Sequence, residues 1–219
     1  MHLPRISALL FDMDGTLVDS DAAVDRAWIT WCAEYGIDAR LALRLAPGHP
    51  AADTVARLLG ARDPDISQEA LAAAAARELE FEYDDLSDVV AADGALELLA
   101  LVDELALPWA VVTSADERLA RARLGAAGIA APVLITTDDI PRGKPDPAGY
   151  LRAAELLGVP IEGCLVVEDA EPGVLAGRAA GARVAGLKSV PADYALTGLH
   201  ELTAALASAF AASAEPPTR

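Results

Sequence analysis

Two aspartates follow the first apolar segment of the chain at a spacing that could support chemistry. Residues 8–11 (Ala-Leu-Leu-Phe) have the pattern of a buried strand, and Asp12 and Asp14 come directly after it. In an extended chain, residues i and i+2 point to the same side. Two carboxylates facing one space could attack an electrophile and exchange a proton with the group that leaves. The plain alternative is a polar turn, because aspartate and glycine are common in turns.

Polar side chains also follow later apolar segments, where parallel strands would end. Thr113, Ser114 and Ala115 come after residues 109–112, and hydroxyl and backbone N–H groups at a helix start can hold a phosphate. An ordinary helix N-cap would use the same residue types. Lys144 stands between a glycine and a proline, on a stiff loop that limits the entropy lost in aiming it. Its alternative is a solvated loop cation.

Glu168 and Asp169 directly follow the apolar segment 164–167. Two adjacent carboxylates without a basic neighbour in sequence repel each other unless a cation binds. Carboxylate oxygens together with several waters are the ligands that Mg²⁺ prefers. The alternative is an acidic pair at a helix N-terminus, where negative charge is also favourable.

Apolar spacing indicates two kinds of organisation along the chain. Residues 22–35, 51–59 and 68–83 have helical periodicity, and no convincing strand lies between about 18 and 90. From about residue 94, helical segments alternate with short apolar strands, which predicts a parallel sheet with helices on both faces. The expected helices there are 95–105, 117–125, 147–157, 172–180 and 199–212, and the expected strands are 109–112, 133–135, 164–167 and 183–186.

The expected fold class is therefore α/β, with a Rossmann-like parallel sheet core, helices on both faces and an inserted helical cap domain. The core would comprise residues 1–17 and 91–219, and the cap residues 18–90. Sheets of this type bind ligands at the carboxyl ends of their strands. An insertion directly after the first strand would lie over that edge of the sheet.

Composition disfavours several classes of function. The chain has 219 residues and a net charge of −17, which argues against binding to nucleic acid or to an anionic membrane. No apolar run reaches the ~18–20 residues of a membrane span, and the first residues lack the apolar segment of a signal peptide. Cys32 and Cys164 are the chain's two cysteines, and we expect free thiols in a reducing cytoplasm.

The negative charge also constrains the substrate. An anionic substrate would be repelled by the protein as a whole, so a metal ion or a local cation must reverse the sign at the site. Only two of the 17 basic residues are lysines, Lys144 and Lys188. A chain that otherwise uses arginine can place a lysine where a compact point charge is needed.

Taken together and in this order, the motifs resemble the four-motif signature of the haloacid dehalogenase-like hydrolase superfamily. The resemblance covers nearly the whole chain, and the helical insertion is similar to the branch that carries a helical cap between the first two motifs. The matching residues are 12–16 (Asp-Met-Asp-Gly-Thr), Thr113 or Ser114, Lys144 with Pro145, and Glu168 with Asp169.

A finer likeness, carried by residues 108–114, 142–145 and 166–174, is to sugar-phosphate phosphatases, including 2-deoxyglucose-6-phosphatase-like members. This resemblance implies a phosphatase for a small-molecule phosphate ester, with no nucleic-acid or membrane partner, and we expect a monomer or a weak homodimer. Residues 170–172 (Ala-Glu-Pro) replace residues that are commoner in relatives, so the likeness is weaker beside the acidic pair.

The resemblance also implies roles for the matching residues. Asp12 would be the nucleophile that forms an aspartyl-phosphate, and Asp14 would protonate the leaving group and then activate water. Lys144 would pair with Asp12 and stabilise charge on the transferring oxygens. Mg²⁺ is the implied cofactor, held by the Asp12 side chain, the Asp14 backbone carbonyl, Asp169, and Glu168 directly or through water.

Substrate contacts are expected on both sides of the site. Thr113 or Ser114, with backbone N–H groups such as that of the next residue, would hold the phosphate, and the resemblance fits either hydroxyl. Arg44, His49 and Asp53, in the loops of the cap, are candidates for contacts with the leaving group. A surface histidine is the alternative for His49.

Other functions on the same residues remain open or are disfavoured. A phosphosugar mutase resembling β-phosphoglucomutase would use the same two aspartates but return the phosphoryl group to a sugar. A binding module without turnover would be expected to lack Asp12, Asp14, Lys144 or one of the acidic pair, yet all are present. The second aspartate argues against a dehalogenase. Neither cysteine lies in the Gly/Arg-rich loop that a thiol phosphatase needs.

Overall fold

The computed structural model describes residues 6–214 and is built around a six-stranded parallel sheet. The strand order is β5-β4-β1-β6-β7-β8, and every pairing in it is parallel. Together with the helices below, this confirms the α/β class predicted from the alternating pattern. The strands are β1 (Ala8–Phe11), β4 (Trp109–Val112), β5 (Leu134–Ile135), β6 (Cys164–Glu168), β7 (Arg183–Gly186) and β8 (Tyr194–Ala195).

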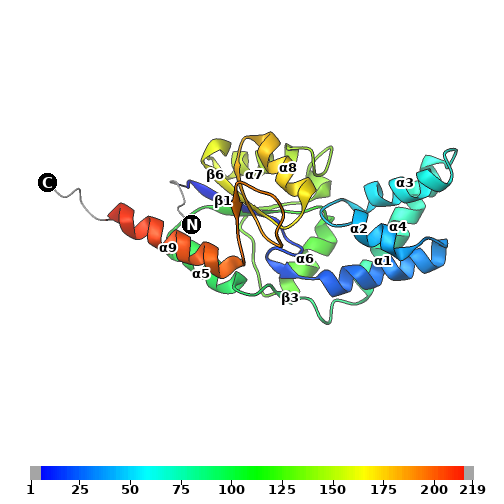
Figure 1. Ribbon diagram of the computed structural model, residues 1–219, viewed down its shortest axis with the longest axis horizontal. Helices are drawn as coiled ribbons and strands as arrows, with labels where there is room; N and C mark the ends of the chain where they lie inside the picture. Colours follow the sequence, from blue (N-terminus) through cyan, green and yellow to red (C-terminus); the bar gives the residue numbers. More distant parts are fainter. Residues whose placement is uncertain (1–5, 215–219) are drawn as a thin grey trace.

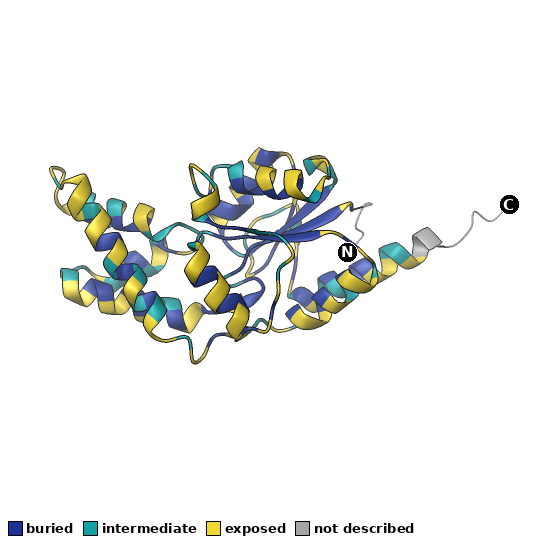
Figure 2. Cartoon of the chain, turned by 180° about the vertical axis from the view of Figure 1, so that it is seen from behind, coloured by how far each residue is buried: buried dark blue, intermediate teal, exposed yellow. Residues whose placement is uncertain are grey.

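Helices cover both faces of the sheet because successive residues of a buried strand point to opposite sides. Leu9 and Phe11 belong to one apolar core, and Ala8 and Leu10 to another. Figure 1 shows the two helical layers above and below the sheet, and Figure 2 shows that the strands between them are buried. The first core is closed by α5 (Ala95–Glu104), α6 (Glu117–Ala126) and α9 (Leu199–Ala214), and the second by α7 (Ala148–Leu157) and α8 (Glu171–Ala180).

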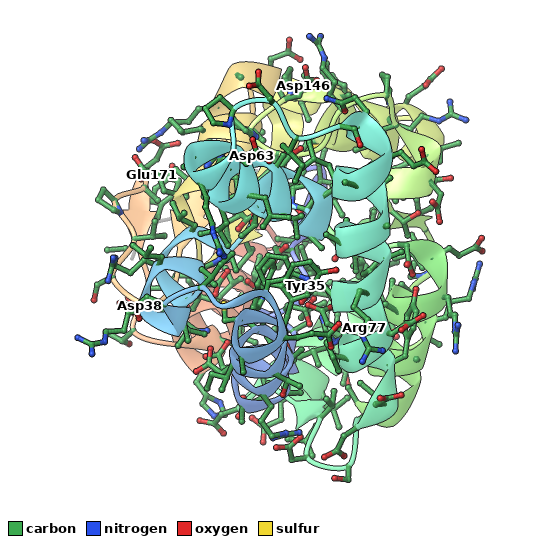
Figure 3. All side chains as sticks on the ribbon, turned by 90° about the vertical axis from the view of Figure 1, so that its right-hand side faces the viewer. Tyr35, Asp38, Asp63, Arg77, Asp146 and Glu171 are labelled. Carbon is green, nitrogen blue, oxygen red and sulfur yellow. The ribbon has the colours of Figure 1, made fainter. Side chains whose placement is uncertain are left out.

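The helical insertion (residues 18–90) has an apolar core of its own. Trp28 and Trp31 of α1 pack in it with residues of the other three helices, and the indole Nε1 of Trp31 donates a hydrogen bond to the carbonyl of Ala74 at 2.9 Å. Arg77 of α4, labelled in Figure 3, bonds Glu34 of α1 at the surface. The helices are α1 (Asp21–Tyr35), α2 (Ala39–Leu45), α3 (Ala51–Arg62) and α4 (Gln68–Asp84).

The expectation that no strand lies between about 18 and 90 is wrong at both ends of the helical insertion. There β2 (Val18–Asp19) and β3 (Val90–Ala91) pair antiparallel. The two connections to the sheet must run side by side, because the insertion leaves and returns at the same place. Two residues are too few for periodicity to reveal a strand. The same shortness explains why α2, β8 and the 3₁₀ turns Thr137–Asp139 and Ile161–Gly163 were not anticipated.

The longer predicted elements are confirmed, with small shifts at their ends. Gly36 ends α1 in the left-handed conformation, with φ of 65°, which glycine adopts without strain. None of the helices within residues 6–214 combines the length and the apolar composition that crossing a membrane requires. The expected absence of a signal peptide rests on the first residues of the sequence. Residues 1–5 lie outside the described residues, so the structure does not test it.

Candidate active site

Strand register brings the predicted motifs to one edge of the sheet. Phe11 of β1 lies beside Val111 of β4 and beside Val167 of β6, so the residues that follow these strands are neighbours. A cavity of about 820 Å³ opens at this edge. It is lined by Asp12, Asp14, Thr113, Ser114, Ala115 and Asp169 from the sheet side, and by Arg44, Gly48, His49 and Arg57 from the helical insertion.

Lys144 is buried and joins Asp12 to the carboxylate of Glu168. Its Nζ donates to Oδ1 of Asp12 at 2.5 Å and to Oε1 of Glu168 at 2.6 Å. The lysine is 4% exposed. Burial lowers the pKa of Lys144, but the charges of Asp12 and Glu168 more than offset burial and leave the pKa raised. Lys144 is therefore a buried cation beside Asp12, the pairing that the family resemblance implies, and not a solvated loop residue.

Glu168 is fully buried and shares its Oε1 between two donors. The hydroxyl of Tyr150 on α7 donates to this oxygen at 2.5 Å, beside the bond from Lys144. Burial, with the nearby charge of Asp12, raises the pKa of Glu168 to about 7. Its other oxygen, Oε2, is buried without a hydrogen-bond partner. A buried carboxylate oxygen with no donor is costly unless a cation meets it.

The carboxylates of Asp12, Glu168 and Asp169 form a cluster that could hold a metal ion. One oxygen from each lies within 4.8 Å of the others. Burial, with the charge of Asp12, raises the pKa of Asp169 to about 6. Oxygen donors with an unsatisfied buried lone pair fit a hard divalent cation such as Mg²⁺. The structure thus brings the acidic pair together with Asp12 in one cluster, and its role as a metal ligand set stays a prediction.

Gly15 leaves room for one of these carboxylates. Its φ of +77° lies in the left-handed region, which side chains rarely adopt. A Cβ at this position would collide with the carboxylate of Asp169. The glycine after Asp14 is therefore required both by the turn and by the close approach of Asp169.

Asp14 is held from two directions. The hydroxyl of Ser20 donates to its Oδ1 at 2.6 Å, and the guanidinium of Arg123 donates to its Oδ2 at 2.9 Å. Arg123 extends from α6 and also bonds Glu82 of α4 at 3.2 Å. Sequence reasoning missed Arg123 and Glu82. Arg123 follows two other arginines on a polar helix, and nothing in the pattern distinguishes it from them.

The two candidate phosphate hydroxyls have different partners. Thr113 Oγ1 accepts a bond from the backbone N–H of Ala115 at 3.1 Å. Ser114 Oγ donates to the carbonyl of Gly48, in the helical insertion, at 3.0 Å. Both residues line the cavity, so either can present a hydroxyl to a phosphate there, and the choice between them stays a prediction.

The candidate contacts in the helical insertion divide into two groups. Arg44 and His49 line the main cavity. Burial, with the nearby charge of Arg57, lowers the pKa of His49, and Arg57 donates to its Nε2 at 3.1 Å. Asp53 lies instead at a second cavity, beside the loop that carries Lys144. It is therefore poorly placed to contact a leaving group bound near Asp12.

Lys188, the second lysine of the sequence, was given no role in the predicted site. It also lines the cavity. It follows β7 and lies 3.1 Å from Asp169 and 2.7 Å from Asp21. Its position after a parallel strand could have indicated a role at this edge of the sheet. The two lysines of the chain are thus both at the site, where they offset its negative charge.

Comparisons with known proteins agree with this geometry. The chain is 40% identical to hexitol phosphatase A of Escherichia coli over 190 residues, which are 86% of each chain. It is 33% identical to 2-deoxyglucose-6-phosphate phosphatase 1 of Saccharomyces cerevisiae, over 82% of this chain and 79% of the relative.

A solved structure and a family match also indicate a hydrolase. The crystal structure of a HAD family hydrolase from Deinococcus radiodurans with bound phosphate and sodium superposes with a TM-score of 0.68 at 29% identity, covering 94% of this chain and 97% of that one. Residues 6–181 match the family described as haloacid dehalogenase-like hydrolase, so the chain belongs to that family.

Proposed function

We propose that the protein hydrolyses small phosphate monoesters of sugars or polyols through an aspartyl-phosphate on Asp12. The observation that carries this proposal is the position of Asp12. Its carboxylate faces the cavity, bonds the buried cation Lys144, and has a second aspartate two residues further along the chain. Together these groups supply a nucleophile, a positive charge for the transferring oxygens and a proton donor.

The first step transfers the phosphoryl group to the protein. An Asp12 carboxylate oxygen attacks phosphorus as the bond from phosphorus to the ester oxygen breaks, and Asp14 gives its proton to that oxygen, so the alcohol leaves neutral. In the second step, water attacks the phosphorus of the aspartyl-phosphate. Asp14 takes a proton from the water, inorganic phosphate leaves, and Asp12 is again a carboxylate.

The acidic cluster supports Mg²⁺ as the cofactor. The side chains of Asp12, Asp169 and Glu168 and the backbone carbonyl of Asp14 would hold the ion, which would supply positive charge to offset the repulsion between Asp12 and a phosphate. Lys144 and Lys188 contribute further positive charge from the protein itself. The chain's charge of −17 makes this local reversal necessary for an anionic substrate.

Sugar or polyol phosphates are proposed as the substrate class on two grounds. The relatives named above act on hexitol phosphates and on 2-deoxyglucose 6-phosphate, as their names state. The cavity has polar groups on the side of the helical insertion, where Arg44 and His49 can meet hydroxyl groups of the leaving alcohol. Thr113 or Ser114 would hold the phosphate end.

The helical insertion acts in this proposal as a cap that closes over the substrate, with residues 1–17 and 91–219 as the catalytic core. A cap of this kind excludes water and selects the leaving group. We place the reaction in the cytoplasm, because Cys32 and Cys164 are both buried free thiols. A monomer or weak homodimer is sufficient, since the groups invoked come from one chain.

Phosphate release from a panel of sugar and polyol phosphates, with and without Mg²⁺, tests the proposal. Wild-type protein is expected to release phosphate only with the metal, and Asp12→Asn is expected to abolish the release. The ranking of the esters then names the substrate. No release from any ester by folded protein with Mg²⁺ would contradict the proposed function.

A further inference from the structure

Arg123 connects the catalytic edge of the sheet to the helical insertion. It extends from α6, which packs in the core below the sheet, and is only 2% exposed. One terminal nitrogen lies 2.9 Å from Oδ2 of Asp14, and the other lies 3.2 Å from Oε2 of Glu82 on α4. A single guanidinium thus bonds a carboxylate of the site and a carboxylate of the insertion.

A second glutamate of α4, Glu78, lies beside Glu82. It lies one helical turn earlier on α4, is completely buried, and has no hydrogen-bond donor for either carboxylate oxygen. Burial, with the neighbouring charge of Glu82, raises the pKa of Glu78 to about 10. Glu78 therefore carries a proton at neutral pH, and Glu82 is the glutamate of α4 that pairs with Arg123.

The planar guanidinium group of Arg123 links the positions of its two bonds. Its terminal nitrogens are fixed relative to each other in one plane, so a bond from one nitrogen sets the position of the other. The bond to Glu82 thereby fixes the nitrogen that meets Asp14. Because an arginine N–H group can only donate, Oδ2 of Asp14 is kept as an acceptor. The oxygen left for proton exchange is Oδ1, beside the rotatable hydroxyl of Ser20.

We propose that Arg123 is a positioning residue for the proposed reaction: anchored by Glu82 of the helical insertion, it holds the Asp14 carboxyl where it exchanges a proton with the leaving-group oxygen. The inference rests on the proposed function. It adds that proton transfer depends on the insertion being in the position seen here, because Glu82 belongs to the insertion and Arg123 to the core.

The dependence of the rate on the leaving group tests this role. The alkoxide of sorbitol 6-phosphate must be protonated as it leaves, whereas the phenolate of 4-nitrophenyl phosphate leaves without a proton. For both esters, kcat/KM reports steps up to the formation of the aspartyl-phosphate. A residue that positions the proton donor therefore affects the two esters differently, and a merely structural residue affects them alike.

Arg123→Lys is the first variant, because it keeps the positive charge and removes the planar pair of terminal nitrogens. We expect kcat/KM for sorbitol 6-phosphate to fall about 10- to 100-fold, and kcat/KM for 4-nitrophenyl phosphate to change less than about threefold. Asp14→Asn should show the same preference for the aryl ester. Arg121→Lys is the matched control, because Arg121 lies on the same helix and pairs with Glu117 at the surface.

Glu82→Gln provides a second variant that decides the question even if Arg123→Lys does not fold. It weakens the anchor without touching Asp14, and its loss should again be selective for sorbitol 6-phosphate. The double variant should lose no more than Arg123→Lys alone, because Glu82 acts through Arg123. Glu80→Gln is its control, since Glu80 lies on the same helix and pairs with Arg77 in solvent.

Equal losses on the two esters, or no loss on either, would overturn the inference while the proposed function stands. A wild-type protein that releases phosphate with Mg²⁺ from neither of these esters nor from any other ester of the panel would instead remove the proposed function itself. Circular dichroism melting of each variant shows which ones are folded under the assay conditions.

Discussion

Lys144 and Asp12 form a buried ion pair, with Nζ of the lysine 2.5 Å from Oδ1 of the aspartate. The two residues are 132 positions apart in sequence and meet only because their loops end at the same edge of the sheet. Burial leaves the pKa of Asp12 raised, and the charge of Lys144 opposes that shift by favouring the ionised carboxylate. A carboxylate must be ionised to act as a nucleophile, so this contact is central to the proposed reaction.

Removal of the lysine charge should therefore slow the reaction. We expect Lys144→Gln to lower kcat about 10²- to 10³-fold, the loss typical of a preorganised group that stabilises transition-state charge. Phosphate release measured with saturating Mg²⁺ checks this. The variant must be shown to be folded, because Asp12 and Glu168 lose their buried partner. A loss below about threefold would contradict the role given to Lys144.

Gly15 should be needed for metal binding. In Gly15→Ala, the new Cβ collides with the Asp169 carboxylate, so we expect the Mg²⁺ concentration for half-maximal activity to rise about 10- to 100-fold. Gly128→Ala is a matched control, because Gly128 also has a positive φ, of +70°, but a Cβ there meets nothing within 4 Å. Equal Mg²⁺ requirements in the two variants would contradict an effect of the Gly15 substitution on metal binding through Asp169.

Metal binding should weaken in acid. The pKa of Asp169 is raised to about 6, first by burial and then by the charge of Asp12, so protons compete with the metal below that pH. We expect the apparent dissociation constant for Mg²⁺, measured by isothermal titration calorimetry, to rise at least about tenfold per pH unit below pH 6, because Glu168, with a pKa of about 7, also takes up a proton there. A constant that does not change between pH 7 and pH 5 would exclude Asp169 as a ligand.

Glu78 should make folding stability depend on alkaline pH. Its pKa is about 10 in the folded protein, through burial and the charge of Glu82, against an ordinary value of 4.5. A raised folded-state pKa contributes stability that is complete below the unfolded-state pKa and is lost as pH rises through the folded-state pKa. The free energy of unfolding should thus decline between about pH 5 and pH 10.

Glu78→Gln tests this decline, because glutamine has the same shape and does not ionise. We expect the variant to gain about 1–3 kcal/mol in free energy of unfolding over wild type at pH 8, and little at pH 4, in urea titrations. Glu80→Gln, at an exposed position on the same helix, should show no such gain. A Glu78→Gln variant less stable than wild type at pH 8 would contradict a protonated Glu78.

Residues at strand ends could be predicted from sequence, and residues that reach the site from helices could not. Asp12, Asp14 and Asp169 follow apolar segments whose parallel pairing brings their ends together, so order along the chain was sufficient. Arg123 reaches Asp14 through the length of its side chain and the packing of α6, neither of which leaves a sequence pattern. Glu78 is similarly hidden, because a glutamate on a helix predicts exposure and not burial.

In the helical insertion, too, the sequence predicts secondary structure better than it predicts which residues reach the site. Its long helices follow from apolar periodicity, but the position of its loops over the sheet depends on tertiary packing. Arg44, His49 and Asp53 were equal candidates from sequence, and the structure places the first two at the main cavity and the third at another. Arg44 and Asp53, expected in loops, lie in α2 and α3, and only His49 lies between helices. Which residues of the insertion meet a substrate is therefore a question of packing, which one sequence does not answer.

Detection of a phosphoryl group on Asp12 tests the central claim most directly. Asp14→Asn should slow hydrolysis of the intermediate more than its formation from 4-nitrophenyl phosphate, so the phosphorylated protein should accumulate during turnover. Acid quenching, proteolysis and mass spectrometry should then find one phosphoryl group on the peptide that contains Asp12, with none in Asp12→Asn. Phosphate release without any phosphorylated peptide, or release that persists in Asp12→Asn, would contradict the account.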